Sequence, residues 1–147
     1  MKNDSGMSII VKRITRITVS LIFLFGVYIM FHGHLNPGGG FAGGVIIALS
    51  FIHLVLAFGK DFAFKYFSKT LAFFLEGLGG LLFLTISLFG VFMGGIFFLN
   101  FLPKGNPFSL FSSGTILVSN FAIFLKVGAG LFSIFIALSL FRLSEKE

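Results

Sequence analysis

Four long apolar stretches dominate the sequence, and their length limits what the chain can fold into. They cover about residues 14–31, 41–58, 71–99 and 115–141. A helix needs roughly 20 predominantly apolar residues to cross a bilayer. Segments such as residues 21–25 are continuously apolar, whereas the strands of a membrane barrel alternate apolar and polar residues. The pattern therefore predicts an all-α integral membrane protein, a single domain over residues 1–147 with four transmembrane helices.

The composition excludes several other classes of protein. Charged residues make up 11% of the chain, against about a quarter in a typical soluble domain, so a soluble fold could not cover its core. The 18% aromatic content excludes an intrinsically disordered chain. The sequence has no Cys, which removes disulfides, thiolate zinc sites and Cys-ligated iron–sulfur clusters. We predict no cofactor in this chain.

Basic residues flank the apolar stretches unevenly, and this bias predicts the orientation in the membrane. They lie around the start of the first stretch, between the second and third, and after the fourth: Lys2, Lys12, Arg13, Arg16, Lys60, Lys65, Lys69, Arg142 and Lys146. The other two connections carry Lys104 alone. Because Lys and Arg of short loops stay in the cytoplasm, we expect both termini there, in a multi-pass protein of the cell membrane. Charges that flank spans indicate anionic lipid headgroups and not nucleic acid.

The connection between the first two stretches is rich in glycine. Pro37 suits the start of a helix, and the glycines after it allow backbone conformations that side chains forbid. Gly40 and Gly44 give the second helix a smooth face for close helix packing. A phosphate-binding loop is excluded, because the ending Gly-Lys-Ser/Thr is missing. Two interpretations stay open, a tight hairpin and a contact with a partner protein.

Two histidines lie in the same connection. His32 and His34 are two residues apart, a spacing that points side chains in different directions on a helix. The outer loops contain no further Cys, His or carboxylate ligands, so we predict no metal site. The histidines either form hydrogen bonds at an interface or line the outer mouth of a proton or cation path.

Lys126 is the ionisable residue deepest in an apolar stretch. It lies eleven residues into the fourth helix, about 17 Å from its start. A cation that faces lipid there costs at least about 2.5 kcal/mol, so Lys126 must face protein, water or a counter-charge. Intramembrane ionisable residues commonly mark ion pathways, which favours a relay over a structural tie to a carboxylate of another subunit.

Glu76 and His53 both fall in the inner half of the membrane. They can make contact if the second and third helices pack together, as their short connection encourages. From inside to outside the ionisable residues then run from this pair through Lys126 to His32 and His34, which is a possible proton relay. The alternative is that each forms hydrogen bonds inside the bundle and does nothing else. The sequence contains no catalytic Ser, His and Asp grouping and no pair of carboxylates suited to general acid and base catalysis.

Two strings of residues resemble a known family. The run from Gly33 to Gly44 is similar to the signature of the MnhB family, the B-type component of multisubunit Mrp cation/proton antiporters. Its matching residues are Gly33, His34, Pro37, Gly38, Gly39, Gly40, Phe41, Gly43 and Gly44. The run from Asn120 to Phe132, in which a Lys precedes Val and small residues, is similar to the family's fourth helix. The resemblance covers essentially the whole chain.

The resemblance implies a small subunit of a hetero-oligomeric membrane complex, beside larger antiporter-like subunits that carry the main ion channel. It implies sodium/proton exchange and supports Glu76, His53 and Lys126 as relay residues. The same type of subunit occurs in archaeal membrane-bound hydrogenases and related sulfur-reducing complexes, where an Mrp-like module is joined to a ferredoxin-oxidising arm. Three interpretations remain: the antiporter module of such a complex, the MnhB-type component of a stand-alone Mrp Na⁺/H⁺ antiporter, and a purely structural assembly subunit.

Overall fold

The computed structural model describes residues 7–144, and this part of the chain is helical with connecting loops. The helices are α1 (Ile9–His32), α2 (Gly40–Phe58), α3 (Lys60–Tyr66), α4 (Lys69–Gly94) and α5 (Thr115–Ser144). Four of them are long and apolar enough to cross a membrane, namely α1, α2, α4 and the Thr115–Ser139 part of α5. The predicted helical class is confirmed, with four helices that could span a membrane. Lys2 and Lys146, two of the cations that predict the orientation, lie outside the described residues.

Local sequence signals determine where several helices begin and end. The hydroxyl oxygens of Ser8 and Ser68 accept hydrogen bonds from backbone N–H groups three residues later, at the starts of α1 and α4. Such N-caps satisfy a donor that has no partner within the helix. Gly59 directly follows α2 and has a φ of 87°, and Gly95 directly follows α4 and has a φ of 72°. Positive φ favours glycine, so these two glycines stop the helices.

The structure differs from the sequence prediction in the third apolar stretch and in the connection before it. The membrane helix there ends at Gly94 and not at residue 99, because the chain leaves the helix at Gly95 and Phe98 adopts a φ of 61°. Residues 96–99 are as apolar as the helix, so hydropathy did not mark this end. The preceding connection contains the short helix α3. α1 begins at Ile9, ahead of the expected residue 14.

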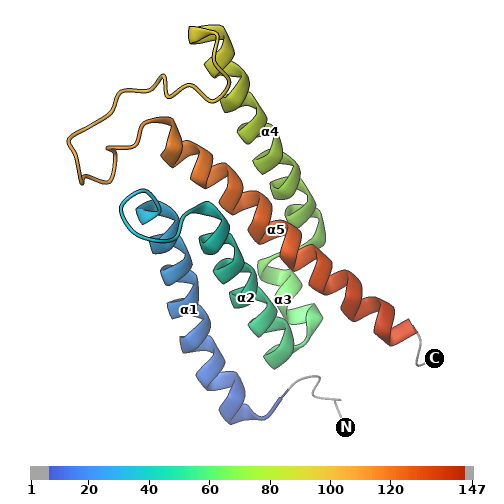
Figure 1. Cartoon of the computed structure of the whole chain (residues 1–147). Coiled ribbons are helices and arrows are strands. Elements are labelled where there is room, and N and C mark those ends of the chain that lie inside the picture. Colours follow the sequence, from blue (N-terminus) through green and yellow to red (C-terminus); the bar gives the residue numbers. More distant parts are fainter. Residues whose placement is uncertain (1–6, 145–147) are drawn as a thin grey trace.

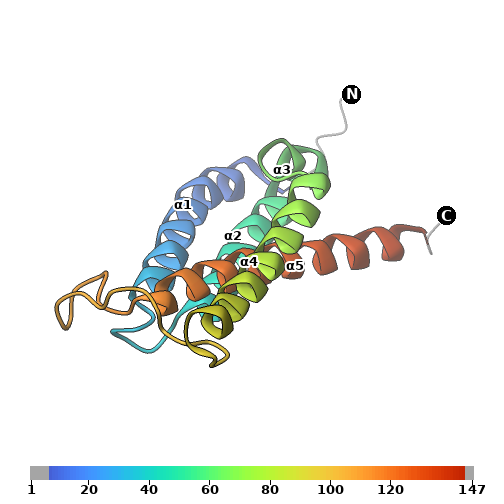
Figure 2. The same ribbon diagram turned by 90° about the horizontal axis from the view of Figure 1, so that it is seen from above.

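The long helix α5 lies between α2 and α4 (Figures 1 and 2). α2 packs against α1, α3 and α5, while α4 packs against α5. The expected packing of the second and third membrane helices is therefore wrong. The reason is that α2 and α4 each pack closely against α5, on different sides of it. A β-carbon on Gly44 of α2 would lie 2.9 Å from the backbone oxygen of Phe124, and one on Gly79 of α4 would lie 2.7 Å from that of Ala122.

The two ends of the bundle differ in content. The start of α1 and the short helix α3 lie at one end, and the loops at residues 33–39 and 95–114 lie at the other (Figure 1). At the α3 end, the backbone N–H of Met7 donates to the carbonyl of Ala57 over 3.1 Å. An apolar cluster joins α2, α3, α4 and α5 there: Val55, Ala63, Phe67, Ala72, Ala129, Phe132 and Ile136. This cluster anchors α4 and α5 to the rest of the bundle.

Candidate functional site: a charged groove between α4 and α5

Glu76 of α4 and Lys126 of α5 line one cavity of about 280 Å³ on the α4–α5 surface. Its other walls are Phe73, Gly77, Gly80 and Leu81. Lys126 is exposed and Glu76 is partly buried. We call this cavity the charged groove. It brings together two of the five predicted relay residues, from helices that are distant in sequence.

Each charged side chain lies against a glycine of the opposite helix. The Nζ atom of Lys126 would be 3.2 Å from a β-carbon on Gly80, and the Oε1 atom of Glu76 would be 3.5 Å from one on Gly130. Gly80 comes four residues after Glu76, and Gly130 comes four residues after Lys126. Residues four apart lie on one face of a helix, about one turn from each other. The opposite charges therefore lie about one turn apart along the same seam.

Glu76 is an acidic residue that lines the same cavity as Lys126. An isolated charge at the centre of a bilayer is unfavourable by at least about 2.5 kcal/mol. Opposite charges in one groove offset part of this penalty, because Coulomb attraction strengthens as the local dielectric falls. The groove nevertheless opens at the surface of the chain, so its two charges are accessible from outside the bundle.

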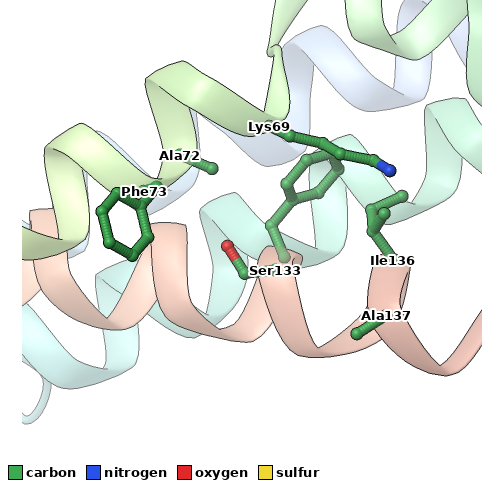
Figure 3. A pocket seen from close by; sticks show the side chains of 7 residues that line it. Lys69, Ala72, Phe73, Ser133, Ile136 and Ala137 are labelled. Atoms are coloured by element: carbon green, nitrogen blue, oxygen red, sulfur yellow. The ribbon is translucent and has the colours of Figure 1, made fainter.

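A second cavity, of about 310 Å³, continues along the same seam toward the α3 end (Figure 3). Its lining residues are Lys69, Ala72, Phe73, Phe132, Ser133, Ile136 and Ala137. Phe73 is shared with the charged groove, so the two cavities adjoin at its ring. Figure 3 shows Phe73 at one side of the cavity and Lys69, the first residue of α4, toward the other. The polar groups of this cavity are the Lys69 amine and the Ser133 hydroxyl.

His53 lies elsewhere, at the interface of α1 and α2. Its Nε2 atom is 3.5 Å from the hydroxyl oxygen of Thr15, and Thr15 is buried at 2% exposure. The anticipated contact between His53 and Glu76 is not formed within the described part of the chain, because α5 separates α2 from α4. Of the ionisable residues predicted to form a relay, Glu76 and Lys126 therefore share a cavity, whereas His53 lies beside Thr15.

His32 and His34 have different partners, as their spacing predicted. The Nδ1 atom of His32 is 2.9 Å from the Tyr28 carbonyl oxygen, and the two rings stack at 4.1 Å between centroids. His34 reaches across to the other loop, where its Nε2 atom is 3.2 Å from the Ser109 carbonyl oxygen. Its Nδ1 atom is buried without a hydrogen-bond partner among residues 7–144. His34 thus connects the loop at residues 33–39 with the loop at residues 95–114.

The glycine motif shapes the contacts of α2. Gly40 and Gly44 face α5, where β-carbons would meet the backbone oxygens of Asn120 and Phe124. Gly43 faces α1, and a β-carbon there would lie 2.8 Å from the Gly26 oxygen. Small residues at these positions let helix backbones approach closely. Within this chain the motif therefore allows α2 to pack closely against both α1 and α5.

Sequence reasoning missed the structural role of Asn100. Its Oδ1 atom accepts hydrogen bonds from the backbone N–H and the hydroxyl of Thr115, over 2.9 and 3.0 Å. Its amide donates to the Ser113 carbonyl over 3.0 Å. Asn100 thereby caps the start of α5 and holds the loop before it. An amide inside an apolar run was the available signal, because such a group is costly when it is not hydrogen-bonded.

The fold and the groove define a multi-pass α-helical membrane protein with two opposite charges in an open groove between helices. Its family follows from comparison with known proteins. The family model described as "Domain related to MnhB subunit of Na+/H+ antiporter" matches residues 10–133. The chain belongs to the MnhB family, which confirms the resemblance in the two sequence strings.

Similar proteins occur in archaea and bacteria. An uncharacterized protein of Methanocaldococcus jannaschii is 38% identical over 122 residues, which is 76% of this chain and 44% of that protein. A putative antiporter subunit mnhB2 of Staphylococcus epidermidis is 48% identical over 57 residues, 39% of this chain and 40% of that protein. The chain thus spans less than half the length of these curated relatives.

A solved structure has the same fold. It is a chain in the "Structure of the membrane-bound sulfane sulfur reductase (MBS), an archaeal respiratory membrane complex". That chain is 33% identical, with a TM-score of 0.70 over 91% of this chain and 58% of its own length. The likeness therefore covers nearly all of the present fold but not all of the larger chain.

Proposed function

We propose that this chain is a membrane-embedded subunit of an Mrp-type cation/proton antiporter module, and that it works in sodium/proton exchange within a multisubunit complex. Membership of the MnhB family supports the exchange. The likeness to a chain of an archaeal respiratory membrane complex supports a module of such an assembly. The mnhB2 relatives support the alternative of a stand-alone antiporter. A purely structural assembly subunit is the third candidate, and the experiment below separates it.

The charged groove is the observation that carries the proposal. A carboxylate and an amine open to the surface of a membrane helix pair would be unfavourable against lipid. Their exposure in the single chain is therefore explained by a neighbouring subunit that covers the groove. With that subunit in place, Glu76 and Lys126 line a polar path between two proteins.

Within this path we assign the exchange to Glu76 and Lys126. Transfer of a proton from the Lys126 ammonium to the Glu76 carboxylate, through intervening water, converts the charged pair into a neutral pair. When Lys126 instead gives its proton to the partner's side of the path, the Glu76 carboxylate is left to attract a cation such as sodium. Proton loss from Lys126 and cation arrival at Glu76 are then coupled by charge. We assign His53, His34 and His32 a lesser part, because their hydrogen bonds hold helices and loops of this chain.

The orientation completes the proposal. We place both termini in the cytoplasm, because basic residues gather at the start of α1, in α3 and at the start of α4. The cavity with Lys69 and Ser133 then opens on the cytoplasmic side and leads past Phe73 to Glu76. His32 and His34 lie at the opposite, outer end.

Substitutions in the intact complex test the assignment. We expect Lys126→Leu and Glu76→Gln each to leave the complex assembled and to lower sodium-dependent proton movement in inverted membrane vesicles by about tenfold or more, the effect of one lost relay group. Lys104→Leu, in the exposed outer loop, is the matched control and should transport normally. Co-purification of the other subunits in mild detergent measures assembly.

The double variant separates the roles further. If Glu76 and Lys126 act as one unit, the double variant should transport no worse than the worse single variant, since groups that act together are non-additive. Loss of the co-purifying subunits in the Lys126→Leu complex would instead indicate a structural tie. Normal assembly with normal transport in both single variants would defeat both roles of the groove. The subunits that co-purify also distinguish a respiratory complex with iron–sulfur proteins from a stand-alone antiporter.

A further inference from the structure

A third cavity lies at the α3 end of the bundle, away from the charged groove. It has a volume of about 480 Å³, within the roughly 300–1,000 Å³ typical of small-molecule sites. Its lining residues are Arg16, Val19 and Ser20 of α1, Leu54 of α2, and Phe62 and Tyr66 of α3. The charged groove is lined by α4 and α5 instead, so the two sites are built from different helices.

The lining of this cavity is amphiphilic. A guanidinium, a hydroxyl and a phenol come from Arg16, Ser20 and Tyr66, while Val19, Leu54 and Phe62 are apolar. A ligand that matches both parts must carry an anionic or polar head beside an apolar chain. A small free anion would leave the apolar wall without a partner.

An aromatic row organises the polar side. The rings of Phe58 and Phe62 stack at 4.4 Å between centroids, and Phe62 and Tyr66 follow at 5.3 Å. The guanidinium carbon of Arg16 lies 5.4 Å from the centroid of the Phe58 ring. A cation above an aromatic face is attracted by the ring, so this contact restrains the guanidinium. Its fork of N–H donors suits a phosphate.

The helices that line the cavity carry more basic than acidic residues, and Arg16 is the charged residue in its wall. Asp61 is the sole acidic residue in the sequences of α1, α2 and α3. The cations of these helices and of the first residue of α4 are Lys12, Arg13, Arg16, Lys60, Lys65 and Lys69. Basic pockets between transmembrane helices near the membrane surface bind anionic lipid headgroups. The short helix α3, with its aromatic and basic residues, is typical of a segment at the membrane interface.

We propose that this cavity binds one anionic glycerophospholipid. Its phosphate lies against Arg16 and Tyr66, and one acyl chain runs along Val19, Leu54 and Phe62. The bound lipid fills the space between α1, α2 and α3 and ties α3 to the membrane. This site is independent of ion exchange at the charged groove.

Native mass spectrometry of the full-length chain in detergent tests the proposal, because a retained lipid appears as a discrete mass. The probes are phosphatidylglycerol, phosphatidylcholine and inorganic phosphate. We expect one phosphatidylglycerol to bind in preference to phosphatidylcholine. Arg16→Gln should lower its occupancy about fivefold or more, the loss of one cation–headgroup contact. Arg16→Lys should retain part of the binding, and Arg13→Gln, a neighbouring cation outside the cavity, should have little effect.

Leu54→Trp keeps every charge but fills the cavity, and it should also release the lipid. Circular dichroism and gel filtration identify variants that do not fold. If Arg16→Gln is among them, Arg16→Lys and Leu54→Trp test the lipid site in its place. Equal losses in Arg13→Gln and Arg16→Gln would overturn the proposal, as would undiminished binding to Leu54→Trp. Displacement of the lipid by millimolar inorganic phosphate would indicate a phosphate site instead. Absence of the lipid from the co-purified complex would also overturn the proposal.

Discussion

Two glycines of α4 provide a matched test of how closely α4 and α5 pack. A β-carbon on Gly79 would lie 2.7 Å from both the Ala122 oxygen and the Lys126 nitrogen, which are backbone atoms of α5. A β-carbon on Gly77 would meet nothing within 4 Å. Both residues lie inside the same helix. Changing each to Ala therefore alters the helix in the same way and the α4–α5 contact in only one case.

The expected magnitude follows from these distances. Ala in place of Gly inside a helix stabilises by roughly 0.5–1 kcal/mol, and this gain is common to both variants. Ordinary van der Waals contact begins near 3.4 Å, so Gly79→Ala must open the seam by about 0.7 Å (3.4 minus 2.7 Å). Overpacking of this kind costs about 1–3 kcal/mol. We expect Gly79→Ala to be less stable than Gly77→Ala by about 1–3 kcal/mol.

Reversible unfolding in detergent, followed by circular dichroism, measures the two free energies of unfolding. Gly77→Ala should be as stable as the unaltered protein or slightly more stable. If Gly79→Ala proved equal to or more stable than Gly77→Ala, α4 and α5 would not be in close backbone contact. The groove geometry derived from that contact would then be wrong as well.

Two further predictions concern the loop before α5 and the α2–α5 contact. Asn100→Ala leaves the N–H and hydroxyl of Thr115 without their acceptor and should lower the free energy of unfolding by about 1–3 kcal/mol. Asn106→Ala, in the same exposed loop, should leave the stability nearly unchanged. Equal thermal stabilities of the two variants would contradict the capping role. Gly44→Ala should destabilise, because its β-carbon would lie 2.9 Å from a backbone oxygen of α5. Gly128→Ala should be neutral or stabilising, since the nearest atom would be 3.4 Å away, and a reversed order in thermal unfolding would refute this packing.

Part of the charged groove is marked in the sequence, although the spacing alone does not identify the partners. Glu76 and Lys126 are each followed four residues later by a glycine, a spacing that places charge and glycine on one helix face. Two such faces, of opposite charge, suit each other across a helix seam. The short connection to α2 pointed to His53 as the partner of Glu76 instead. That connection is taken up by α3, which leaves room for α5 beside α4.

The sequence by itself determined the class of protein and the approximate spans, because bilayer thickness acts on consecutive residues. It also determined the place of Lys126 along its helix, eleven residues after Thr115. Only the tertiary structure decided which helices are neighbours, and hence that Glu76 and Lys126 line one groove while His53 lies beside Thr15. Neighbour choice depends on how small residues of distant segments fit together, and that fit involves several helices at once.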